Sequence, residues 1–192
     1  MKKLFIEKMQ NNPVIATVKS LDKLDAALDS ECEVVFLLCG DIFNLKAIVE
    51  KAKSKNKIIF IHVDLIDGFS RDATALKYIH EEIKPNGIIS TKNSQLKCAK
   101  QLGLLTVQRL FIIDSLSIDT TVKSSASIAP DAVEIMPGIM PRITKKLCTQ
   151  LDVPVIVGGL ISEKEDIINA IASGAKGVST SDSDLWGGQI YG

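Results

Sequence analysis

The sequence has no excess of charge of either sign, because 23 lysines and arginines balance 23 aspartates and glutamates. No global positive field attracts nucleic acid, so any such contact must come from a local patch. Aromatic residues are also scarce, at 5%, whereas 46% of the chain is hydrophobic. Abundant Ile, Leu and Val with few aromatics favour a globular α/β chain with buried parallel strands.

Paired cysteines and long apolar runs are missing as well. The four cysteines, Cys32, Cys39, Cys98 and Cys148, are scattered and form no C-x-x-C pair. The sequence shows no signal-peptide pattern, and no apolar run approaches the roughly 18 residues that a membrane span needs. We therefore expect reduced thiols, a cytoplasmic protein and no membrane contact.

Strand-like and helix-like segments alternate along the chain. Helices are predicted at residues 21–29, 42–54, 71–83, 94–102, 114–128, 139–151 and 163–173. Short apolar runs predict strands at residues 13–19, 33–38, 57–65, 87–91, 104–112, 132–136, 155–159 and 177–181. Eight strand–helix units favour a compact TIM-barrel-like (β/α)8 fold of the α/β class over an open doubly wound sheet.

The chain is short for this fold, which typically takes about 250 residues. Only residues 182–186 and a glycine-rich tail follow the last predicted strand, so we expect a short or missing final helix. No linker or low-complexity segment divides the chain. We expect one domain over residues 1–192, in which residues 187–192 form a flexible tail.

Small residues end the last two predicted strands. The run at residues 155–159 ends in Gly158-Gly159, the run at residues 177–181 ends in Ser179-Thr180-Ser181, and one helix separates them. Many (β/α)8 barrels bind phosphate after their last two strands, where small residues leave backbone N–H groups open. We predict a phosphate site there, although a plain tight turn would also explain the two glycines.

Further polar residues stand at the expected carboxyl ends of the strands, where barrels place functional side chains. They are Lys19, Asp41, His62, Asp64, Arg109 and Glu134. Asp41 is either a helix N-cap or a ligand contact. Glu134 lies inside an apolar strand, so its carboxylate must be satisfied. Either Lys19 or Arg109 pairs with it or, as we favour, it binds substrate hydroxyls.

Two neighbouring pairs leave alternatives open. His62 and Asp64 point to the same face of a strand and form either a hydrogen-bonded pair or half of a metal site. No second histidine supports a metal, so we expect none. Alternation sends Gln108 and Arg109 to opposite faces and does not say which of them lines the interior.

The chain resembles the glycerol uptake operon antiterminator family, also called glycerol-3-phosphate-responsive antiterminators. The resemblance covers residues 35–42, 62–68, 84–91, 104–109, 134–141, 158–161 and 179–181, and the runs at 136–141 and 158–161 are the most specific. It implies a TIM-barrel-like regulator, without catalytic residues or cofactor, that binds glycerol-3-phosphate. Such a regulator acts on the leader mRNA of glycerol-utilisation genes, so that transcription continues past a terminator.

The residues favour the ligand more clearly than the RNA. No RNA-binding motif is present, and the RNA-binding residues remain unknown. Two helices carry modest basic patches, Arg142, Lys145 and Lys146 on one and Lys92, Lys97 and Lys100 on another. Each patch alone is more often a solvated face, so RNA contact needs an assembled surface, for which we suggest a ligand-promoted homo-oligomer.

The alternative function is enzymatic. A small barrel isomerase, aldolase or lyase acting on a triose or sugar phosphate would share the fold and the phosphate site. His62, Asp64 and Glu134 would then supply acid–base chemistry.

Overall fold

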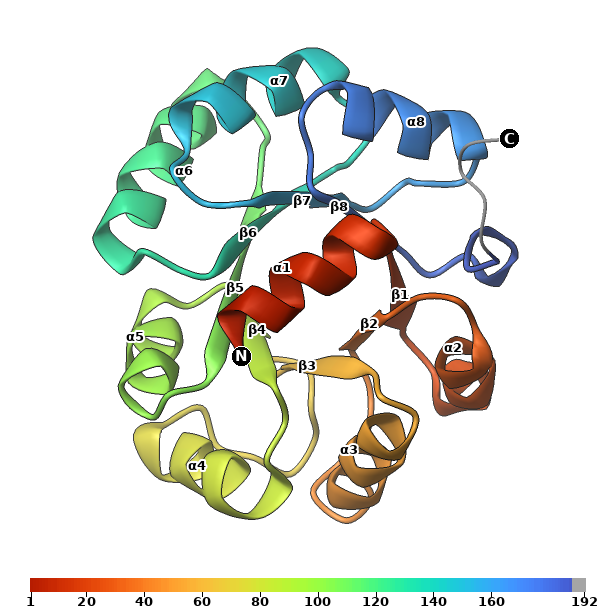
Figure 1. Ribbon diagram of the computed structural model, residues 1–192. Coiled ribbons are helices and arrows are strands. Elements are labelled where there is room, and N and C mark those ends of the chain that lie inside the picture. Colours follow the sequence, from red (N-terminus) through yellow and green to blue (C-terminus); the bar gives the residue numbers. More distant parts are fainter. Residues whose placement is uncertain (188–192) are drawn as a thin grey trace.

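The computed structural model describes residues 1–187, and its eight strands close into a parallel barrel in chain order (Figure 1). Val14 of the first strand pairs with Val178 of the last, which closes the ring. The strands are β1 (Val14–Val18), β2 (Val34–Leu37), β3 (Ile58–His62), β4 (Gly87–Ser90), β5 (Leu105–Phe111), β6 (Ala132–Met136), β7 (Val155–Gly158) and β8 (Gly177–Thr180). The predicted TIM-barrel-like fold is confirmed.

Helices surround the barrel and pack their apolar faces on it (Figure 1). They are α2 (Leu24–Asp29) with the 3₁₀ turn η1 (Leu21–Lys23), α3 (Leu45–Ser54), α4 (Ala73–Tyr78) with the π turn η2 (Ile79–Ile83), α5 (Asn93–Gln101), α6 (Ser115–Ile128), α7 (Pro141–Gln150) and α8 (Lys164–Ala172). No helix within residues 1–187 is both long and apolar enough to cross a membrane.

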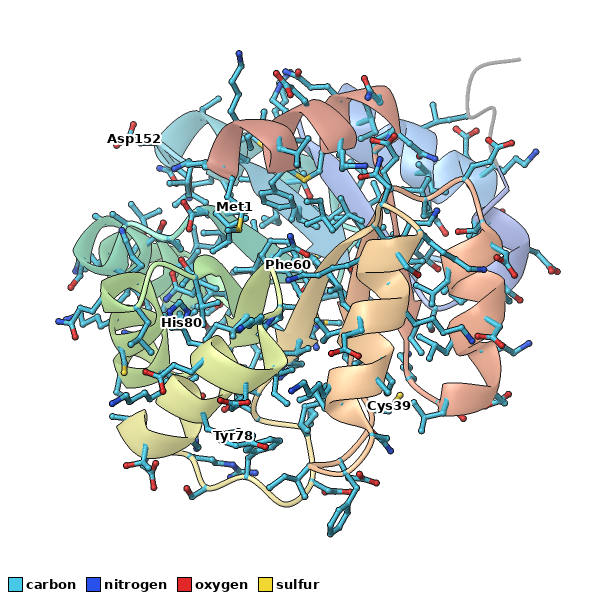
Figure 2. The ribbon with its side chains drawn as sticks, turned by 60° about the horizontal axis from the view of Figure 1, so that its bottom comes forward. Met1, Cys39, Phe60, Tyr78, His80 and Asp152 are labelled. Carbon is cyan, nitrogen blue, oxygen red and sulfur yellow. The ribbon has the colours of Figure 1, made fainter. Side chains whose placement is uncertain are left out.

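A helix that we did not predict, α1 (Lys2–Asn11), closes the amino-terminal end of the barrel. Figure 1 shows it lying across that end, and Figure 2 shows the labelled Phe60 beneath it. Its Phe5 and Met9 are 0% and 1% exposed. The rings of Phe5 and Phe60 lie 4.8 Å apart, so α1 completes the core inside the barrel.

Between β8 and Gly187 the chain forms a single 3₁₀ turn, η3 (Ser183–Leu185), in the gap between α8 and α2 (Figure 1). Trp186 follows it, is buried, and donates its indole N–H to the carbonyl of Thr180 at 2.9 Å. The prediction of a short or missing final helix is therefore confirmed. Of the predicted tail, residues 188–192 lie outside the described part of the chain.

Inside the barrel, side chains change from apolar to polar along the strands. The lower layers contain apolar residues such as Ile15, Phe36 and Val107, which form one core with α1. Because alternate residues of each strand point inward, the same series continues to buried polar residues at the carboxyl ends. These are Thr17, His62, Arg109, Glu134 and Ser179. The fold thus gathers polar groups at one end, as barrels do.

Candidate ligand-binding site

A small cavity of about 60 Å³ opens at the carboxyl end of the barrel. Its wall is formed by the ends of β1, β5, β6 and β8 and by the segments that follow β2, β7 and β8. The polar residues in this wall are Thr17, Lys19, Arg109, Glu134, Ser179, Thr180 and Ser181. We call it the β7–β8 cavity.

Arg109 is fixed in this cavity by a buried ion pair. Its Nε donates to Glu134 Oε2 at 2.7 Å, and Ser179 Oγ donates to Glu134 Oε1 at 2.6 Å. Glu134 is fully buried, and these two hydrogen bonds satisfy both oxygens of its carboxylate within the protein. We had favoured Glu134 as a ligand for substrate hydroxyls, whereas its contacts indicate that it orients Arg109.

The guanidinium of Arg109 is only partly used by this pair. Among residues 1–187, no hydrogen bond involves its two terminal nitrogens. A planar guanidinium held by its Nε presents these N–H groups as a fork, which suits phosphate or carboxylate oxygens. The arrangement therefore provides an oriented cationic donor in the cavity wall.

Gln108 and Arg109 point to opposite sides of β5, as alternation requires. Gln108 Nε2 donates to Asn93 Oδ1 of α5 at 3.0 Å and to Ser124 Oγ of α6 at 2.7 Å. Gln108 therefore faces the helices and Arg109 faces the interior, which settles the choice that the sequence left open.

The two glycines after β7 have different roles. A Cβ on Gly158 would lie 2.1 Å from Ser179 Oγ and 2.9 Å from Glu134 Oε1, so only glycine leaves room for the hydrogen bond between them. Gly159 has φ +77°, and Leu160 follows with φ +62°. These left-handed residues form the turn, so the tight-turn interpretation describes Gly159 well.

Backbone N–H groups surround the cavity without partners in the protein. Within residues 1–187, no hydrogen bond uses the N–H groups of Gly159, Leu160, Ile161 or Ser181, all of which line it. Lys19 is exposed at the same opening. Open amides beside two cations form a site with the electrostatics that a phosphate group requires.

Thr17 is a residue of this cavity that sequence reasoning missed. It is 6% exposed, and its buried Oγ1 has no hydrogen-bond partner among residues 1–187. A buried hydroxyl without a partner costs free energy unless something else satisfies it. The only sequence signal was its position two residues before Lys19, on the same face of β1.

His62 and Asp64 lie outside the cavity wall. His62 is 3% exposed, and its Nδ1 is 3.8 Å from Asp64 Oδ2, too far for a hydrogen bond. Burial, helped by the charge of Arg109, lowers the pKa of His62 to about 4. The imidazole is therefore neutral near pH 7, and the two side chains form no ion pair.

Asp64 instead joins the ends of two neighbouring strands. Its Oδ2 accepts from Ser90 Oγ and from the backbone N–H of Thr91, both at 2.9 Å. Among residues 1–187, no group of three or more His, Cys, Asp or Glu side chains is arranged to hold a metal ion.

Asp41, another predicted ligand-binding residue, forms its hydrogen bonds within its own turn. Its Oδ1 accepts from the backbone N–H groups of Phe43 at 2.8 Å and Asn44 at 3.1 Å. It therefore caps the turn before α3, and it does not line the cavity. Thr180 has a similar internal role, because its Oγ1 donates to the carbonyl of Ile161 at 3.2 Å and links the two loops.

A larger hollow, of about 300 Å³, lies at the opposite end of the barrel between α1 and the start of β7. Its wall is mainly apolar and includes Ile6, Met9 and Leu151. Since barrels place function at the carboxyl ends of their strands, we assign the ligand site to the smaller, polar cavity.

Comparisons with known proteins agree with one another. Residues 14–186 match the family described as "Glycerol-3-phosphate responsive antiterminator". The uncharacterized protein YgcP of Escherichia coli K12 is 40% identical over 178 residues, which cover 93% of each chain.

Two solved structures are similar to the whole barrel. The glycerol uptake operon antiterminator regulatory protein of Listeria monocytogenes has 36% identity and a TM-score of 0.88, covering 93% of this chain and 97% of its own. A glycerol uptake operon antiterminator-related protein of Thermotoga maritima has 28% identity and a TM-score of 0.79, covering 90% and 96%. Solved aldolases at 12 to 14% identity share the fold alone.

Proposed function

The chain belongs to the glycerol-3-phosphate responsive antiterminator family, and we propose that it is a regulator controlled by glycerol 3-phosphate. The phosphate binds in the β7–β8 cavity. The liganded protein then acts on the leader mRNA of glycerol-utilisation genes, so that transcription continues past a terminator. It works as a cytoplasmic protein and needs no cofactor.

One observation carries the ligand part of this proposal, namely that Arg109 is fixed beside four open backbone amides. A phosphate dianion gains charge-assisted hydrogen bonds from the guanidinium and from oriented N–H groups. Lys19 adds a second cation at the opening. The unpartnered Thr17 hydroxyl, on the neighbouring strand β1, supplies a hydrogen bond for a glycerol hydroxyl.

The same contacts favour a regulator over an enzyme. Both oxygens of Glu134 accept hydrogen bonds within the protein, which leaves the carboxylate poorly placed to take a proton from a substrate. The eight strands contain no lysine that would serve as a Schiff-base nucleophile. Turnover of any triose or sugar phosphate by the purified protein would support the enzymatic alternative instead.

Thermal unfolding with and without ligand tests the proposal. Ligand at about 100 times its dissociation constant adds about 2.7 kcal/mol to the free energy of unfolding. For a chain of this size we expect sn-glycerol 3-phosphate to raise the melting temperature by about 5–10 °C. Glycerol should have no effect. An equal rise with inorganic phosphate would show that the site recognises phosphate alone, and no rise with either phosphate would reject it.

Two exposed lysines on the same segment provide a matched pair for this test. Lys19 lines the cavity, whereas Lys23, in η1, does not. Lys19→Gln should weaken binding of glycerol 3-phosphate by about tenfold, because a contact between charged groups at a partly open site is worth about 1.4 kcal/mol. Lys23→Gln should keep the wild-type affinity in titration calorimetry. Equal losses would mean that long-range charge, and not this cavity, attracts the ligand.

A further inference from the structure

We infer that the RNA binds across the outer surface of three neighbouring helices, α5, α6 and α7. This inference rests on the proposed function, which makes RNA the partner, and it assigns the surface that the sequence left unknown. We call the surface the α5–α7 face. Its exposed cations are Lys97 and Lys100 on α5, Lys123 on α6, and Arg142, Lys145 and Lys146 on α7.

Negative charge is nearly absent from these helices. Asp119 is the one acidic residue within the bounds of α5, α6 and α7. Among residues 1–187, no salt bridge occupies any of the six cations. The α5–α7 face therefore presents unneutralised positive charge, which is the electrostatic footprint of a polyanion site.

The opposite side of the ring is different. Lysines of α3 and its C-cap form ion pairs with acidic residues on both neighbouring helices. Lys51 and the C-cap Lys55 pair with Asp25 and Asp29 of α2, and Lys46 pairs with Glu82 of η2. These lysines are locally neutralised. Although the net charge of the whole chain is zero, the local charge therefore differs around the ring, and a polyanion favours the basic side.

The fold joins patches that are separate in the sequence. Helix α6 lies between α5 and α7 (Figure 1), and Asn93 of α5 donates to Ser124 Oγ of α6 at 3.1 Å. Lys123 therefore stands between the cations of α5 and those of α7. Other exposed residues of α6 include Ser115 and Ser127, whose hydroxyls can donate to phosphate oxygens. A single chain thus provides the assembled surface, without an oligomer.

An exposed aromatic residue lies at the rim of the barrel, where β5 leads into α6, the middle helix of this face. Phe111, at the end of β5, is 54% exposed, and Ile113 and Leu116 follow at 87% and 70%. An unpaired base stacks readily on such a ring. A basic face with an exposed aromatic residue at its border favours a single-stranded or loop segment of RNA over a regular duplex, whose bases are not accessible.

Fluorescence anisotropy with a labelled random-sequence RNA of about 40 nucleotides, with saturating sn-glycerol 3-phosphate, tests this assignment. The test variant is Lys123→Gln/Lys145→Gln/Lys146→Gln. The control is Lys46→Gln/Lys51→Gln/Lys55→Gln, which removes the same charge from α3 and its C-cap. The test variant should bind at least about tenfold more weakly, and its slope of log K against log salt should fall by about 2, because each lost phosphate contact on a single strand removes about 0.7.

Phe111→Ala should weaken binding by about tenfold without changing that slope, because it removes stacking and no charge. All substituted side chains are exposed, and circular dichroism should confirm that the variants keep the wild-type fold. If Phe111→Ala leaves RNA binding unchanged but alters the sedimentation coefficient, the rim is a protein contact and its assignment to RNA is overturned.

The possible failures are distinguishable. Equal losses in the α5–α7 and α3 variants, or wild-type affinity in the α5–α7 variant, would overturn the assigned surface and leave the proposed function intact. If the wild-type protein binds no RNA with or without ligand, the RNA part of the proposed function fails and the surface with it. The thermal shift with glycerol 3-phosphate reports on the ligand part separately.

Discussion

Glu134 and Arg109 form the most deeply buried charged contact of the cavity. The side chains are 0% and 7% exposed, and Ser179 completes the coordination of the carboxylate. The pair holds a cation in place inside the barrel. Such an arrangement depends on both partners, since a buried charge without its counterion is strongly unfavourable.

The variant Glu134→Gln should therefore destabilise the protein by about 3–5 kcal/mol, because it leaves the Arg109 guanidinium buried without its counterion. Urea denaturation measures this change. The control is Asp25→Asn, which removes the partner of Lys51 in a pair that is 45% and 68% exposed. The control should change the free energy of unfolding by less than about 1 kcal/mol. A similar small effect in both variants would contradict a structural role for the buried pair.

At this scale the sequence predicted much of the cavity wall. Lys19, Arg109 and Ser179 converge as expected, because parallel strands end together and alternate residues point inward. Alternation does not say which of two adjacent residues faces the interior, so only the structure shows that Arg109 does and Gln108 does not. The role of Asp41 could not be predicted from the sequence, because a side chain that can bind a ligand can equally cap its own turn.

The element that the sequence analysis missed, α1, buries few of its residues. Its buried residues are Phe5, Lys8 and Met9, so its apolar face is too narrow to produce a clear helical pattern. Packing on the open end of the barrel stabilises it instead. The strands, by contrast, were predicted to within a few residues, because their continuous apolar runs are buried on both faces.

Substitutions on α1 should separate its two faces. Phe5→Ala removes a fully buried ring that packs against Phe60, and we expect a loss of about 3–5 kcal/mol in the free energy of unfolding. Leu4→Ala, one residue earlier and 45% exposed, should cost less than about 1 kcal/mol. Denaturant titration of both variants is the measurement. A tolerant Phe5→Ala variant would mean that α1 is not part of the barrel core.

The stability of the whole molecule should fall in mild acid because of His62. Burial lowers the pKa of this side chain to about 4, below its ordinary value of 6.5. As the pH falls between these values, the unfolded chain takes up a proton that the folded chain does not accept. Linkage then favours unfolding, and stability rises again as the pH is raised through this range.

We expect the titration of His62 to lower the free energy of unfolding by about 2 kcal/mol between pH 7 and pH 4.5. Other groups titrate over the same range, so the contribution of His62 is the difference between wild type and His62→Gln. The variant should lose less stability than the wild type on acidification in urea titrations without ligand. Identical pH profiles would show that the imidazole is not held neutral.

Strand β5 bears Arg109 in the wall of the cavity and Phe111 at the edge of the α5–α7 face, and Phe111 pairs with Met136, which also lines the cavity. One strand therefore reaches both proposed binding sites. If glycerol 3-phosphate raises the affinity of the protein for RNA by some factor, thermodynamic reciprocity requires RNA to raise the affinity for glycerol 3-phosphate by the same factor. At equilibrium, the protein bound to its transcript would then hold glycerol 3-phosphate with a higher affinity than the free protein does.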